Sequence, residues 1–236
     1  MVEIIVIAKQ VNMADSVKCD FAGVEAAIRF KKKLEANIKI VVMGDEKSGI
    51  AQVRDAISMG ADSGCVLVTN KESADSWTIA KAFSDYLKSE SFDLLLSGSF
   101  PIDADTIQTG LRAGNMLNLA SVSHIEDIEK TDDEKVILIK KRMEDRVQNS
   151  EISLPCMLAC LPHPEAPIYK TVAGINRAYS ADIPVINLDL DDQKGKIKVV
   201  DSFKIGERKR GKCITSISTE GAAREIIDTI ATNHIL

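Results

Sequence analysis

Aromatic side chains are scarce in this chain. They make up 4% of its 236 residues, whereas 45% of the residues are hydrophobic. A core with so few rings must be filled by Ile, Val, Leu, Ala and Met. Aliphatic cores of this kind are typical of strands that are buried on both faces of a sheet covered by helices. The length suits one large domain, or one domain with an appendage.

Segments that direct a protein to a membrane are also lacking. Residues 1–9 begin a predicted strand at once, without the basic region and the long apolar stretch of a signal peptide. No apolar run approaches the roughly 18 residues that a membrane-spanning helix needs. We therefore expect a cytoplasmic protein with no membrane span.

Positive charge is not in excess, because the formal net charge is -5. Proteins that bind nucleic acids need clustered Lys and Arg to face the phosphate backbone. Two short basic runs, residues 31–33 and 208–210, are more typical of solvated surfaces. We expect no nucleic-acid partner.

Cysteines are few, odd in number and scattered, which indicates free thiols in a reducing compartment. They are Cys19, Cys65, Cys156, Cys160 and Cys213. With His163, two of them offer three metal ligands, but structural zinc takes four ligands at closer spacing. Their shared parity on a strand favours two core cysteines. No Ser-His-Asp or Cys-His arrangement is visible either, so we predict no metal site and no catalytic residues.

The first half of the chain alternates strands and helices. Apolar runs predict strands at residues 4–7, 38–43, 65–69 and 94–97, and a helical pattern follows each of them. This alternation predicts an α/β fold with a mostly parallel sheet and helices on both faces. Such sheets bind ligands beyond the carboxyl ends of their strands.

The second half has a different pattern. Residues 135–142 and 146–153 resemble paired antiparallel strands, and residues 155–160 form another apolar strand. From residue 182 the chain is polar and irregular until an amphipathic helix at 221–233. We therefore predict an α/β domain at residues 1–181 and an extended C-terminal arm at 182–236 that docks on a partner.

The strongest candidate for a binding site is the turn at residues 97–110. Gly98 lets the backbone approach a ligand closely, and the helix that follows presents N–H groups and a partial positive charge that favour phosphate. Thr106, Gln108 and Thr109 add donors in its first turn. The same residue types also suit a plain helix start capped by Asp105, so the residues alone favour neither interpretation.

Two further groups belong to this prediction. Asp103 and Asp105 are more plausible as braces of the turn than as an acid/base pair. Ala8 and Lys9 end the first strand, where Ala8 could let an adenine lie against the backbone and Lys9 could reach a ligand or pair with Asp103. The alternative is a short connection with an exposed lysine.

The run at residues 98–110 resembles the adenine-nucleotide phosphate loop of electron transfer flavoprotein β subunits. The family pattern is Gly-Lys/Arg-Gln-x-Ile-Asp-x-Asp-x-x-Gln-x-Gly, and this chain reads Gly-Ser-Phe-Pro-Ile-Asp-Ala-Asp-Thr-Ile-Gln-Thr-Gly. Ser99 and Phe100 replace the basic residue and the Gln of that pattern, and the loop at residues 12–20 is shorter than is usual. Other segments resemble the family in the same order, at residues 7–11, 24–29, 58–62, 154–155 and 165–169, and at Ile175.

The resemblance implies a fold similar to adenine-nucleotide α-hydrolases and a function as an electron carrier rather than an enzyme. The β subunit pairs with an electron transfer flavoprotein α subunit that carries FAD, and the heterodimer passes electrons from a flavin dehydrogenase to an acceptor. Its own nucleotide is AMP, or a second FAD in electron-bifurcating members. The runs at residues 75–78 and 103–106 look more like the bifurcating branch.

A proline-rich segment at residues 161–167 cannot form a helix or an interior strand. In the family this region engages the dehydrogenase through an apolar side chain. The resemblance therefore implies Leu161 as the anchor, with Pro162, His163 and Pro164 beside it. The alternative is a rigid connector.

Two other functions remain open. The chain could be a stand-alone adenine-nucleotide sensor of related α/β fold, or a nucleotide-dependent hydrolase or ligase. A sensor does not need an arm at residues 182–236, and the chain has no Gly-Lys-Ser/Thr phosphate loop typical of ATPases.

Overall fold

The computed structural model describes residues 1–13, 16–18, 21–69, 75–99, 106–164, 167–190, 200–201, 203, 213 and 218–232. Contacts divide the chain into two compact units, Met1–Lys198 and Val199–Leu236. The first unit holds the sheet, and the second holds one helix, α6 (Thr219–Thr232). None of the helices in the described part of the chain is long and apolar enough to cross a membrane.

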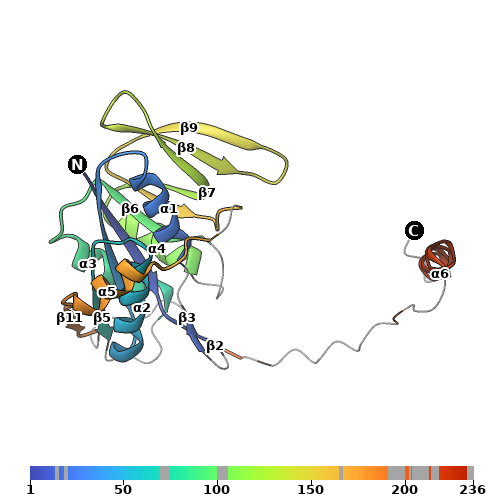
Figure 1. Ribbon diagram of the computed structural model, residues 1–236, viewed down its shortest axis with the longest axis horizontal. Helices are drawn as coiled ribbons and strands as arrows, with labels where there is room; N and C mark the ends of the chain where they lie inside the picture. The colour runs from blue at the N-terminus through green and yellow to red at the C-terminus, as the bar shows by residue number, and fades with distance from the viewer. Residues whose placement is uncertain are drawn as a thin grey trace. The chain divides into compact units, whose positions relative to one another are not determined.

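The first unit contains a nine-stranded sheet, in the order β11-β5-β4-β1-β6-β10-β7-β8-β9. Figure 1 shows β8 and β9 at one end of the unit and β5 and β11 at the other. Its strands are β1 (Val2–Lys9), β4 (Ala36–Met43), β5 (Ser63–Thr69), β6 (Leu94–Gly98), β7 (Ala120–Lys130), β8 (Val136–Arg142), β9 (Val147–Ser153), β10 (Cys156–Cys160) and β11 (Val185–Leu188). All neighbours pair in parallel except β7 with β8 and β8 with β9. The predicted mostly parallel sheet with antiparallel strands is confirmed.

Helices cover both faces of this sheet. Helices α1 (Ala22–Lys31), α2 (Glu46–Met59) and α5 (Val172–Ser180) contribute to one hydrophobic core, with Ile4 and Val6 of β1. Helix α3 (Ser76–Leu87) contributes to the other core with Ile5 and Ile7, and α4 (Thr106–Met116) lies on that same face. Strand β1 is buried on both faces, which explains its continuous aliphatic run.

Two strands of the sheet differ from the sequence prediction. The expectation of irregular chain from residue 182 is wrong for β11, which pairs in parallel with β5. Its apolar pattern is only four residues long, so β11 is recognised as a strand by its pairing with β5 and not by its sequence. Strand β7 was not predicted, because its alternation of apolar and polar residues is interrupted. His124 has a φ of 62°, and the register with β8 shifts between Ile125 and Asp127.

A second, two-stranded sheet follows the first strand directly. It pairs β2 (Val11–Met13) with β3 (Ser16–Lys18) in antiparallel register, where the sequence indicated only a short loop. The hairpin follows the carboxyl end of β1, which is the end at which a ligand site was predicted.

Candidate functional site

A small cavity lies at the carboxyl ends of β1 and β6. Its volume is about 10 Å³, and its lining includes Ala8, Lys9, Gly98 and Thr109. The chain passes from β1 outward to β4 and β5 and then returns to β6 on the other side of β1. The gap between β1 and β6 is therefore the topological switch point of the sheet, where open α/β sheets bind their ligands.

Close packing of helices on β6 shapes this site. A Cβ atom on Gly110 of α4 would lie 2.7 Å from Met157 Cε and would also overlap the Ser97 side chain. From the opposite face, a Cβ atom on Gly23 of α1 would lie 3.0 Å from the Ser97 carbonyl carbon. Both helices thus approach the end of β6 more closely than other residues would allow, and α4 begins beside the strand end.

Ser99 leaves a polar atom in the interior of this turn. The residue is 1% exposed, and its N–H donates to the Cys160 carbonyl over 2.7 Å. Its Oγ is buried and has no hydrogen-bond partner within the structure as described. A buried hydroxyl without a partner costs roughly 1–3 kcal/mol, so this oxygen is suited to bonding a polar ligand.

The structure brings together four of the predicted nucleotide residues, Ala8, Lys9, Gly98 and Thr109. Gln108 is exposed instead, and its Oε1 accepts a hydrogen bond from Arg112 over 2.6 Å. Thr106 is the first residue of α4, but its side chain lies outside the described part of the structure, as do Asp103 and Asp105.

Arg112 was not predicted, although it lies near the start of two helices. Its guanidinium donates to Ser76 Oγ over 2.7 Å at the first residue of α3, and to Gln108 near the first turn of α4. Helix N-termini carry partial positive charge, and a guanidinium beside them strengthens the attraction for an anion. In the sequence, only the i to i+4 spacing of Gln108 and Arg112 indicates that their side chains could interact on one helix face.

Gln10 was also missed, and it connects the end of β1 to the start of α2. Its Oε1 accepts from the Asp45 N–H over 2.7 Å and from Ser48 Oγ over 3.3 Å. The side chain of Asp45 caps α2 by accepting from the Ser48 N–H, and this hydrogen bond lowers the pKa of Asp45. These bonds hold the edge of the site at the ends of β1 and β4.

The proline-rich segment is anchored at its start. The Leu161 N–H donates to the Ile125 carbonyl over 2.7 Å. Leu161 and His163 are half-buried against a small cavity beside α1 and β7, whereas Pro162 and Pro164 are exposed. The predicted anchor side chain is therefore only partly accessible to a partner.

An exposed apolar stripe, here called the α5 stripe, follows this segment. It consists of Tyr169, Val172, Ile175 and Tyr179, which are 73%, 78%, 37% and 71% exposed. The three helical residues recur at a spacing of three and four, so they share one face of α5. Sequence reasoning missed the stripe, although its helical spacing was visible.

Helix α5 is fixed rigidly against α2. Arg177 donates to the carbonyls of Ile57 and Ala61, each over 3.0 Å, at the C-terminal end of α2. Gly174 brings the two backbones into contact, because a Cβ atom there would overlap the Ser58 carbonyl. The α5 stripe is therefore an apolar surface on a rigid support.

Cys156 and Cys160 lie in β10 and are buried in the core. Burial raises the pKa of the Cys156 thiol to about 12, so it stays protonated and is a poor metal ligand. His163 lies beyond the strand, and the described residues contain no cluster of three metal-ligating side chains.

Comparison with known proteins identifies the family. A family model described as "electron transfer flavoprotein domain" matches residues 4–191. The electron transfer flavoprotein subunit beta of Thermoanaerobacterium thermosaccharolyticum is 25% identical over 227 residues, which cover 92% of this chain and 86% of that protein. Subunit CarD of the caffeyl-CoA reductase-Etf complex of Acetobacterium woodii is 29% identical over the same shares of both chains. The subunit beta of Bacillus subtilis is 25% identical and covers 89% of this chain and 83% of that protein. Because the family model covers most of its length, this chain belongs to the electron transfer flavoprotein family, with β subunits among its relatives.

Proposed function

We propose that this chain is the β subunit of a heterodimeric electron transfer flavoprotein and holds an adenine nucleotide at the carboxyl ends of β1 and β6. The position of these residues at the topological switch point carries the proposal, because Ala8 of β1, Gly98 of β6 and Thr109 of α4 meet there. Its relatives include β subunits of electron transfer flavoproteins. The chain works in the cytoplasm as a carrier subunit and not as an enzyme.

The residues of the site bind and orient the nucleotide. The N–H groups at the start of α4 face the phosphate, and the hydroxyls of Ser99 and Thr109 add donors close to the strand end. Ala8 has a small side chain that would let the adenine lie against the backbone of β1. Asp103, Asp105, Thr106 and Gln108 complete the loop by resemblance to the family. The nucleotide is AMP, or a second FAD.

The flavin of the α subunit supplies the electron transfer chemistry when it is bound. This chain has binding roles: it holds its nucleotide, binds the α subunit and presents a surface to the flavin dehydrogenase. The α5 stripe is the apolar part of that surface, because a partner buries exposed aromatic and aliphatic side chains on a rigid helix at little entropic cost. The proline-rich segment before it adds to the same surface and has little conformational freedom; its residues are Leu161, Pro162, His163 and Pro164.

Co-expression with the product of the neighbouring gene tests the function. We expect a purified heterodimer that contains flavin, with AMP or additional FAD bound by this chain. One FAD with one AMP indicates a simple carrier, and two FAD indicate the bifurcating branch. A monomer that binds adenine nucleotide without flavin or partner would support the alternative, a stand-alone sensor.

A double variant tests the nucleotide site. We expect Thr106→Val with Thr109→Val to weaken nucleotide binding at least tenfold, because a hydrogen bond to a charged group contributes roughly 1.5–3 kcal/mol. As a control, Ser150→Ala with Ser153→Ala removes two hydroxyls from β9, at the edge of the sheet, and should leave nucleotide binding unchanged. Equal nucleotide content in all three proteins, measured after denaturation, would show that the turn is only a helix cap.

A charge placed on the α5 stripe tests the docking surface. Val172→Asp should lower the rate of electron transfer from the dehydrogenase at limiting concentration by about tenfold or more, because it buries an unpaired charge in the interface. Flavin content should not change. Ala173→Asp adds the same charge to the same helix at an exposed position off the stripe and serves as the control. Equal loss in both variants would point to net charge and not to the stripe.

A further inference from the structure

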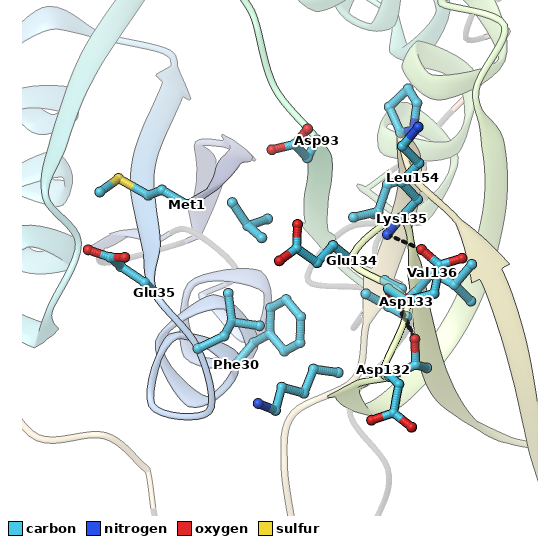
Figure 2. A pocket seen from close by; sticks show the side chains of 16 residues that line it. Met1, Phe30, Glu35, Asp93, Asp132, Asp133, Glu134, Lys135, Val136 and Leu154 are labelled. Atoms are coloured by element: carbon cyan, nitrogen blue, oxygen red, sulfur yellow. Dashed lines mark hydrogen bonds between the residues drawn. The ribbon is translucent and has the colours of Figure 1, made fainter.

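A large cavity lies at the opposite end of the sheet from the proposed nucleotide site. Its volume is about 830 Å³. It opens where the turn between β7 and β8 stands away from the amino ends of β1, β6 and β10, beside the end of α1 (Figure 2). Its lining shares no residue with the proposed nucleotide site or with the α5 stripe.

The floor of this cavity is apolar and the rim is acidic. Phe30 and Ile137 are buried in the floor, and Leu34 and Leu154 are half-buried beside them. Five carboxylates and two lysines line the cavity. The carboxylates are those of Glu35, Asp93, Asp132, Asp133 and Glu134, which come from three separate segments of the chain.

Three of these carboxylates form no ion pair within the described part of the chain. Glu35, Asp132 and Glu134 are exposed and form no ion pair with any described residue. The lysines that line the cavity are Lys130 and Lys135, so acidic side chains outnumber basic ones there by five to two. An excess of negative charge around one opening attracts a cationic group.

The carboxylates are held on opposite sides of the opening. The turn that carries Asp132 and Glu134 is braced by Thr131 Oγ1, which donates to the carbonyls of Asp133 and Val136 over 2.9 and 2.8 Å. Leu154 N–H donates to the Lys135 carbonyl over 2.8 Å, which fastens the turn to the strand beneath. Figure 2 shows Glu134 projecting from this turn into the cavity, with Glu35 on the far side and Phe30 between them.

We propose that this cavity docks a basic segment of a partner protein, in which an aliphatic or aromatic side chain enters the floor and a flanking Lys or Arg meets the acidic rim. An apolar centre with a polar, solvent-accessible rim is the arrangement of protein interfaces. Exposed ion pairs contribute little one by one, so solvated carboxylates on a rim suit a partner that makes several contacts at once. This proposal is independent of the nucleotide site.

A peptide probe tests the proposal on the full chain with labelled methyl groups. The blocked pentapeptide Ala-Lys-Leu-Arg-Ala should shift the methyl resonances of Leu34, Ile137 and Leu154, whereas Ala-Glu-Leu-Glu-Ala should not. Binding should weaken about tenfold in Glu35→Gln with Asp132→Asn and Glu134→Gln, because three attractive charges are lost. The same three changes at Glu144, Asp145 and Glu151 remove equal charge near or on β9 and should leave binding intact.

Every other result overturns the proposal. An absence of shifts at millimolar peptide shows that the cavity does not dock basic segments. Binding that survives the rim substitutions shows that the carboxylates do not recognise the partner. If hexylamine binds as tightly as the peptide, the cavity is a site for small cationic molecules and not for a protein segment. Thermal unfolding of each variant, with midpoints equal to the parent, excludes misfolding as the cause.

Discussion

At the residue scale, one polar network connects β4, β5 and α3 on the face that carries α3. Lys39 Nζ lies 2.8 Å from a Glu90 carboxylate oxygen and 5.5 Å from the centre of the Tyr86 ring. The Tyr86 hydroxyl lies 3.3 Å from Cys65 Sγ. Burial raises the pKa of both Cys65 and Tyr86, so these groups stay neutral in the physiological range.

Glu90 behaves in the opposite way and gives the network a pH dependence. Burial works against its charge, but hydrogen bonds from Lys39 and Tyr86 outweigh that effect and hold the pKa of Glu90 below its ordinary value of 4.5. A carboxyl group with a depressed folded-state pKa stabilises the fold above its unfolded pKa, and the effect is lost as the pH falls through the folded pKa.

We therefore expect Glu90→Gln to lower the free energy of unfolding at neutral pH by about 0.5–1 kcal/mol, a range typical of partly exposed ion pairs. The difference from the parent should shrink as the pH falls below 4.5. Urea unfolding at several pH values measures it, with Glu144→Gln as the exposed control. A difference that stays constant into the acid range would contradict the ion-pair explanation.

At the element scale, α4 depends on two glycines for its position. Gly110 lies against Ser97 at the end of β6, and Gly114 lies one turn further along, where a Cβ atom would be 2.6 Å from Ser121 Oγ. Both positions lack space for a methyl group. Only Gly110 lines the cavity at the end of β1 and β6.

We therefore expect substitutions at the two glycines to have different effects on nucleotide binding. Gly110→Ala and Gly114→Ala should each lower the free energy of unfolding by roughly 1–3 kcal/mol, the usual cost of overpacking. Only Gly110→Ala should also weaken AMP binding, because it moves the first turn of α4 away from the strand end. Denaturant unfolding and calorimetric titration measure the two effects. If both variants bind AMP like the parent, the position of α4 does not control the site.

At the scale of the whole molecule, the described residues of the second unit contribute no buried side chain to the core. Helix α6 has no buried residues, and Ile226 and Ile227 are 50% and 63% exposed. Val200 and Phe203 are 92% and 84% exposed. Apolar side chains exposed to this extent are typical of surfaces that a partner covers.

Ending the chain after Lys198 should therefore leave the unfolding midpoint of the first unit within about 2 °C, because none of the described residues beyond it is buried. Co-purification with the α subunit should be lost. Ile226→Asp with Ile227→Asp in the full chain should produce the same loss without shortening the chain. A truncated chain that unfolds at a clearly lower temperature would show that the arm stabilises the sheet.

Local sequence patterns predicted most of the sheet, because the spacing of apolar residues in a strand or helix indicates which of its faces is buried. The runs at residues 4–7 and 94–97 indicated buried strands, and a helical pattern followed residue 105. Strand β7 escaped this reasoning because a bulge interrupts its alternation, and β11 because four residues carry too little pattern.

The sequence by itself determined the α/β class, the alternation of elements and the family. Only the tertiary structure decided which residues meet. Lys9 and Gly98 line one cavity because β1 and β6 are neighbours at the switch point, and Arg112 reaches Ser76 because α3 and α4 pack side by side. The acidic rim gathers Glu35 and Glu134 across about a hundred residues for the same reason. Periodicity reports which face of an element is buried, whereas the partners on that face depend on strand order and helix packing.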